Sequence, residues 1–112
     1  MSIHHFGPNE PIDVSPLQDR FSGQKTSTLF MSTQMEVIRM VLPAGKTIAE
    51  HKAPGDISVQ CLEGSVEFTA SGKTHVLSSG RMLYLESGTP HSLKSLEDCS
   101  ILLTIVVAGA SR

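Results

Sequence analysis

Turn-forming residues recur along most of this chain at short intervals, and this rhythm limits the possible folds more than any other feature. From Lys25 onward, signals such as Pro43-Ala44-Gly45, Ser71-Gly72 and Ser87-Gly88-Thr89-Pro90 follow one another at intervals of about eight to twelve residues. No segment between them has the 3.6-residue apolar period of an amphipathic helix. Short strands separated by such turns are typical of a β-sandwich or β-barrel, so we predict an all-β protein.

The segments between the turns are rich in β-branched and bulky apolar residues, as strands are. We predict strands over residues 26–31, 35–42, 57–62, 65–70, 73–77, 81–85, 91–95 and 99–107. Residues 1–34 are interpreted as an N-terminal arm with a short helix and the first strand, and residues 35–112 as a barrel. In the arm, Ser15 before Pro16 predicts the N-cap of that helix, and Phe21-Ser22-Gly23 its end.

Composition excludes several classes of partner. The chain has 112 residues, which is one domain, and its net charge of -2 is spread along the sequence, so no basic face for nucleic acid is expected. The longest apolar run, Ile101 to Ala108, is too short for a membrane span, and no signal peptide is recognised. Cys61 and Cys99 are too few for a disulfide framework, so we expect a cytoplasmic protein with reduced thiols.

Glycines and histidines between residues 45 and 91 have the spacing of the two patterns G-x5-H-x-H-x3-E-x6-G and G-x5-P-x-G-x2-H-x3-N. The residues in register are Gly45, His51, Gly64, Gly80, Gly88 and His91. Over about residues 35–107 this pattern resembles the two motifs of the cupin superfamily, in particular small cupin 2-like proteins. The resemblance implies a double-stranded β-helix, or jelly-roll-like, barrel of two antiparallel sheets.

The same resemblance implies a metal site made of three histidines and a glutamate. Here Ala53 stands at the second histidine position and Ile57 at the glutamate position, while His51 and His91 remain. Glu86 and Ser95 replace the proline and asparagine of the second motif. We therefore expect a divalent metal such as zinc, nickel, manganese or iron to be bound weakly, through His51 and His91.

Strand alternation indicates what surrounds these histidines. Residues 57, 59 and 61 share one face of a strand and are expected to form an apolar pocket floor. The predicted pocket consists of His51, Ala53, Ile57, Val59, Cys61 and His91. Asp56 comes one residue before Ile57, so strand alternation points its side chain to the other face of the strand. It reaches the site only if the turn before it shifts the register.

Other candidate residues are interpreted individually. Cys61 is expected to be a small buried hydrophobe and His75 an exposed side chain, while His4-His5 is a second place where an ion could bind. Arg39 lies deep in a predicted strand, and two interpretations remain possible. Its side chain extends outward to solvent, or it anchors an anion inside the barrel.

Three functions remain open, and no catalytic residue is assigned. The first is binding of a small molecule in a mostly apolar pocket with two histidines at its mouth. The second, implied by the resemblance, is a metal-dependent dioxygenase- or isomerase-like enzyme using His51 and His91. The third is a structural or regulatory dimer. Because small cupins pair through sheet extension, we expect a homodimer in which residues 26–31 add to a neighbour's sheet.

Overall fold

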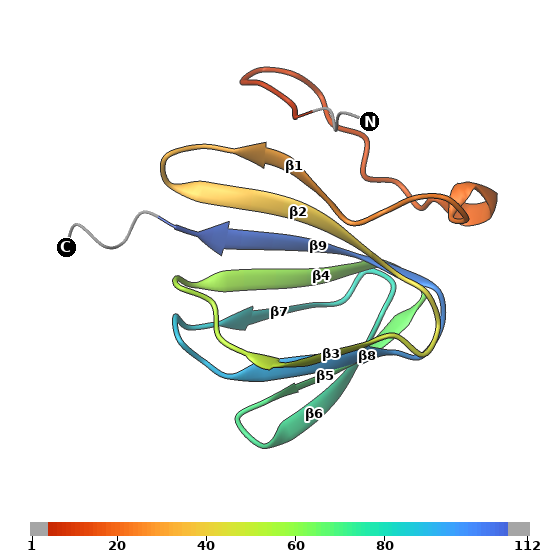
Figure 1. Cartoon of the computed structure of the whole chain (residues 1–112), viewed down its shortest axis with the longest axis vertical. Helices are drawn as coiled ribbons and strands as arrows, with labels where there is room; N and C mark the ends of the chain where they lie inside the picture. The colour runs from red at the N-terminus through yellow and green to blue at the C-terminus, as the bar shows by residue number, and fades with distance from the viewer. Residues whose placement is uncertain (1–4, 108–112) are drawn as a thin grey trace.

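The chain forms two antiparallel sheets that lie face to face (Figure 1). The computed structural model describes residues 5–107. The five-stranded sheet has the order β1 (Ser27–Met31), β2 (Met35–Leu42), β9 (Cys99–Val106), β4 (Ile57–Glu63) and β7 (Met82–Leu85). The four-stranded sheet has the order β3 (Thr47–His51), β8 (His91–Ser95), β5 (Ser65–Ala70) and β6 (Lys73–Ser78). The prediction of an all-β barrel of the jelly-roll type is confirmed.

The core lies between the sheets and follows from strand alternation. Along β4, Ile57, Val59 and Cys61 are buried and the residues between them are half-buried. They pack in one cluster with Val66 and Phe68 of β5 in the opposite sheet. This cluster holds the two sheets together, because removing apolar side chains from water is the main favourable term in folding.

One strand was not predicted. β3 pairs with β8 at the edge of the four-stranded sheet, and its register shifts between Ile48 and His51. Four of its five residues are exposed, so it carries no alternating apolar pattern. An edge strand of this kind is set by its neighbour and leaves little signal in its own sequence.

The short helix of the arm starts later than expected and is capped differently. It is a 3-10 helix, η1 (Gln18–Arg20). Its N-cap residue is Leu17, whose side chain makes no capping hydrogen bond. Ser15 does not cap it. Instead the carboxylate of Glu63, at the end of β4, accepts the backbone N–H of Leu17 at 2.9 Å and that of Gln18 at 3.1 Å. A partner distant in sequence satisfies the donors that a local serine was expected to take.

Arg39 lies on the outer face of the five-stranded sheet, between that sheet and the arm. The arm lies on the β1–β2 side of the molecule, away from the four-stranded sheet (Figure 1). Along β2, Met40 and Leu42 contact the core cluster, whereas Val37, Arg39 and Val41 are buried outside it. Arg39 therefore points away from the barrel interior, which excludes an anchor inside the barrel. It does not extend into solvent either, because it is only 7% exposed.

The motif glycines, Gly64 and Gly80 among them, adopt the left-handed conformation that the tight turns require. Gly64 has φ 78° and Gly80 has φ 91°. Their surroundings differ: a Cβ on Gly64 would lie 2.2 Å from the carbonyl oxygen of Asp98, whereas no atom lies within 4 Å of a Cβ on Gly80. Gly64 thus allows both the turn and the close approach of β4 to the start of β9.

Among residues 5–107, no helix is long and apolar enough to cross a membrane. Both cysteines are free and fully buried, as expected for Cys61. Burial raises the pKa of the Cys61 thiol and that of Cys99, the latter to about 12. Both side chains are therefore uncharged thiols in the core at neutral pH.

Candidate functional site

Two histidines meet where β3 ends and β8 begins. His51 and His91 are direct cross-strand partners, and their ring centroids are 4.3 Å apart with the planes inclined at 60°. The ring of His91 also stacks on Phe68, with centroids 5.5 Å apart. His91 is 5% exposed, while His51 is exposed. The pair thus has one fixed buried ring and one ring open to solvent.

The hydrogen bonds of the two rings determine which nitrogen atoms are free. Nδ1 of His51 lies 2.9 Å from the carbonyl oxygen of Ala49, and Nδ1 of His91 lies 2.9 Å from that of Thr89. A carbonyl oxygen can only accept, so in each neutral ring Nδ1 carries the proton and donates it. Both Nε2 atoms therefore keep a lone pair, which can accept a hydrogen bond or bind a metal ion.

The pair borders a small cavity between the sheets, with a volume of about 60 Å³. The lining residues are Met40, Ile48, His51, Val59, Phe68, His91, Leu93 and Leu103. All except the two histidines are apolar. The arrangement therefore places two imidazole rings in the wall of an otherwise hydrophobic space.

The structure brings only part of the predicted pocket together. His51, His91 and Val59 line the cavity. Ile57 and Cys61 belong to the same core cluster as Val59 but do not line the cavity, and Ala53 packs against that cluster without lining the cavity. Cys61 is also engaged by its own turn, since its Sγ lies 3.4 Å from the carbonyl oxygen of Glu63.

The remaining lining residues were missed by sequence reasoning. They are Met40, Ile48, Phe68, Leu93 and Leu103. Alternation within β2, β5, β8 and β9 places such residues on an inner face, but it does not say which inner residues stand beside the histidines. That choice depends on how the two sheets are stacked.

These residues do not fit the four-ligand metal site that the resemblance implies. Within residues 5–107, no group of three or more His, Cys, Asp or Glu side chains could hold an ion together. Asp56 does not complete the set, because its Oδ1 accepts the N–H of Ser87 at 2.9 Å and holds that loop. His75 is exposed on β6, as expected. His4 lies outside the described residues, so the His4-His5 interpretation rests on the sequence alone.

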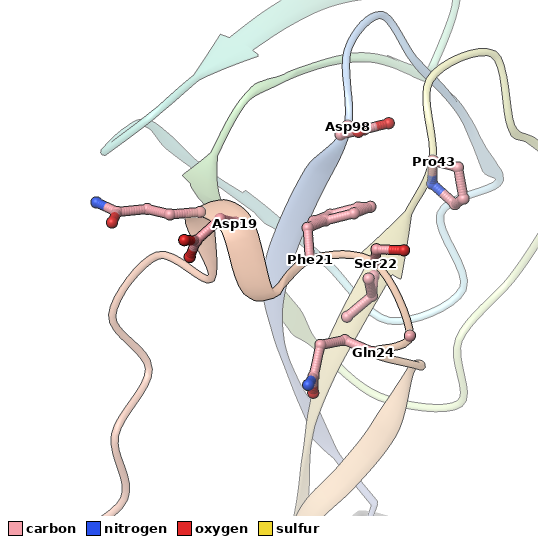
Figure 2. A pocket seen from close by; sticks show the side chains of 9 residues that line it. Asp19, Phe21, Ser22, Gln24, Pro43 and Asp98 are labelled. Carbon is pink, nitrogen blue, oxygen red and sulfur yellow. The ribbon is translucent and has the colours of Figure 1, made fainter.

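A larger hollow of about 470 Å³ lies elsewhere, where the 3-10 turn of the arm faces the strand ends (Figure 2). Phe21, Pro43 and Asp98 are among its lining residues. It contains no histidine and is open to solvent, and Asp98 is already used, because its Oδ1 accepts the N–H of Ala44 at 2.9 Å. The histidine cavity is smaller, but it is more enclosed and has two imidazoles in its wall. We therefore take it as the candidate site.

The comparisons with known proteins agree with the fold. A family model described as "Cupin domain" matches residues 38–107, more than half of the chain. No curated protein matches the sequence.

Several solved structures share the fold. A conserved protein of unknown function from Streptococcus pyogenes is 25% identical with a TM-score of 0.74, over 95% of this chain and 96% of that one. A cupin superfamily protein from Desulfitobacterium hafniense is 14% identical with a TM-score of 0.75, over 96% and 99% of the two chains. The DMSP lyase DddQ from Ruegeria pomeroyi is 20% identical with a TM-score of 0.67, over 78% of this chain and 48% of that one.

Proposed function

Since the chain belongs to the cupin domain family, we propose that it binds a compact, partly apolar small molecule at the His51–His91 pair. The observation that carries the proposal is the pair of free Nε2 acceptors at one end of an apolar cavity. Apolar lining with a few placed polar groups is the usual composition of a small-molecule site.

The cavity restricts the ligand. Its volume of about 60 Å³ is well below the roughly 300–1,000 Å³ of ordinary ligand pockets. Only a head group or a short chain of a few heavy atoms therefore enters, and the rest of the ligand lies at the exposed side of His51. Because both Nε2 atoms accept in the neutral rings, the entering group is a donor such as a hydroxyl or an amine.

A metal-dependent activity is the second candidate, favoured by one observation. Histidines that ligate metals typically donate their other ring N–H to a carbonyl or carboxylate, as both histidines do here. Two imidazoles without the third histidine and the glutamate bind an ion weakly, so we assign no metal-dependent step. The DMSP lyase of Ruegeria pomeroyi shares the fold at 20% identity, and that likeness extends to the fold alone.

The binding proposal is tested with a panel of small alcohols and amines, followed by NMR of the methyl groups. We expect saturable shifts at Val59, Leu93 and Leu103 for at least one probe. The variant His51→Ala removes one acceptor from an exposed position and should weaken binding about fivefold, since a hydrogen bond contributes about 1 kcal/mol. The matched control is His75→Ala, which removes an exposed histidine outside the cavity. Absence of any saturable shift at these methyls, or equal weakening by both variants, would refute the site.

The metal alternative is tested separately. After dialysis against a chelator, zinc, manganese, nickel and iron(II) are titrated by calorimetry into the chain and into His51→Ala and His91→Ala. We expect binding no tighter than micromolar. Submicromolar affinity that is lost in both variants would replace the proposal by a metal-dependent enzyme. Heat that depends on neither histidine would place the ion elsewhere.

A further inference from the structure

A second cavity lies between the arm and the outer face of the five-stranded sheet. Its volume is about 230 Å³, and its charged lining side chains are Asp13, Arg20, Lys25 and Arg39. Three cationic side chains thus share this space with one carboxylate. It is distinct from the histidine cavity, because consecutive residues of β2 line the two: Arg39 this one and Met40 the other.

Arg39 is buried here with part of its hydrogen-bonding capacity unused. Its side chain is 9% exposed. Every side-chain bond of Arg39 is made by Nη2, which donates to the carbonyl oxygen of Ser15 at 2.7 Å, to Oγ of Ser100 at 3.1 Å and to Glu63 at 3.5 Å. The buried Nε has no partner among residues 5–107. A guanidinium has five donors in a fixed planar fork, and leaving a buried donor unpaired costs about 1–3 kcal/mol.

Glu63 compensates Arg39 only in part. Its carboxylate also accepts the N–H groups of Leu17 and Gln18 and the hydroxyl of Ser100, the last at 2.7 Å. The charge of Glu63 is therefore shared among four donor residues and mainly fastens the arm.

The rim of the cavity leaves the positive charge in excess. Arg20 and Lys25 are exposed on the arm. Asp13, the single carboxylate of the lining, accepts the N–H of Ser15 at 2.9 Å. A site lined by a buried guanidinium and two exposed cations favours an oxyanion, which matches the guanidinium fork and makes charge-assisted hydrogen bonds.

We propose that the arm cavity binds a compact oxyanion, a carboxylate or a phosphate group, on Arg39, with Arg20 and Lys25 closing over it. The anion would meet the unused donor side of the guanidinium while Nη2 keeps its bonds to the arm and to β9. This role is independent of the function proposed for the histidine cavity.

The test is calorimetric titration of inorganic phosphate, acetate and succinate into the full chain in a chloride buffer of constant ionic strength. We expect one saturable site for at least one of these anions, and the comparison among them distinguishes a phosphate from a carboxylate site. NMR should place the shifts at the amides of Ser15 and Ser27 and leave the Val59 and Leu93 methyls unchanged.

Variants at the rim keep the test independent of folding. Arg20→Gln with Lys25→Gln alters two exposed side chains and should weaken anion binding about tenfold or more. The matched control, Lys73→Gln with Arg81→Gln, removes the same charge from exposed residues outside the cavity and should leave affinity unchanged. The proposal is overturned if no anion gives saturable heat up to about 10 mM, or if the control pair weakens binding as much as the rim pair.

Discussion

Replacing Gly64 by alanine tests the packing of the barrel, with Gly80→Ala as the matched control. Both glycines have positive φ, 78° and 91°, so an alanine costs about 1 kcal/mol of backbone strain at either position. Only at Gly64 does the new methyl group meet the fold. It would lie 2.2 Å from the carbonyl oxygen of Asp98 and 2.9 Å from Cα of Cys99, both backbone atoms that cannot turn aside.

The difference in the free energy of unfolding between the two variants therefore measures the cost of the steric overlap at residue 64. Gly80→Ala should lower the free energy of unfolding by about 1 kcal/mol. Gly64→Ala should lower it by about 2–4 kcal/mol, because overpacking adds about 1–3 kcal/mol to the strain when β4 and β9 are forced apart. Urea unfolding followed by circular dichroism suits this chain, which has no tryptophan. Equal losses in the two variants, or a Gly64→Ala protein as stable as the parent, would refute the packing argument.

Three further predictions follow from the site and the arm. Burial raises the pKa of Glu63, but the N–H of Leu17, Ser100 and the other donors outweigh it and hold that pKa below its ordinary 4.5. The stabilisation is thus present above pH 4.5 and is lost as pH falls through the lower folded value, so acid unfolding should be less steep in Glu63→Gln. An unchanged pH profile would exclude a stabilising contact between the Glu63 carboxylate and the arm. Long-range ¹H–¹⁵N spectra of neutral His51 and His91 should show protonated Nδ1 and bare Nε2, and an Nε2–H signal from either ring would contradict the assigned acceptors. Light scattering should give a dimer, and a mass of 12.0 kDa at micromolar concentration would argue against one.

The strands that could be predicted are those whose burial alternates or whose ends are marked by turns. β2 and β5 begin and end where the sequence predicts, because the two faces of each strand differ in burial and its residues alternate accordingly. β3 was missed because an exposed edge strand has nearly the same surroundings on both faces. The 3-10 helix was placed too early because its capping group is Glu63, which lies 46 positions after Leu17.

The two histidines of the candidate site could be predicted from the sequence, but the residues that other strands place around them could not. The resemblance to the cupin motifs implies that His51 and His91 are neighbours, and the two residues are direct cross-strand partners. It does not reveal that Ile57 and Cys61 belong to the packed core while Phe68 reaches the ring of His91. The burial of Arg39 was equally hidden, because the segment that covers it comes from the arm.

The two histidines lie on strands that differ in the number of neighbouring strands they pair with. β8 is paired on both sides, with β3 and β5, whereas His51 is the last residue of a bulged edge strand. The His91 ring is thus held in place by two neighbouring strands, whereas the His51 ring can move with the end of β3. Most of the conformational entropy lost on binding would then come from the end of β3. Amide exchange at the end of β3 should be fast in the free chain and slow when a ligand is held, while exchange in β8 changes little.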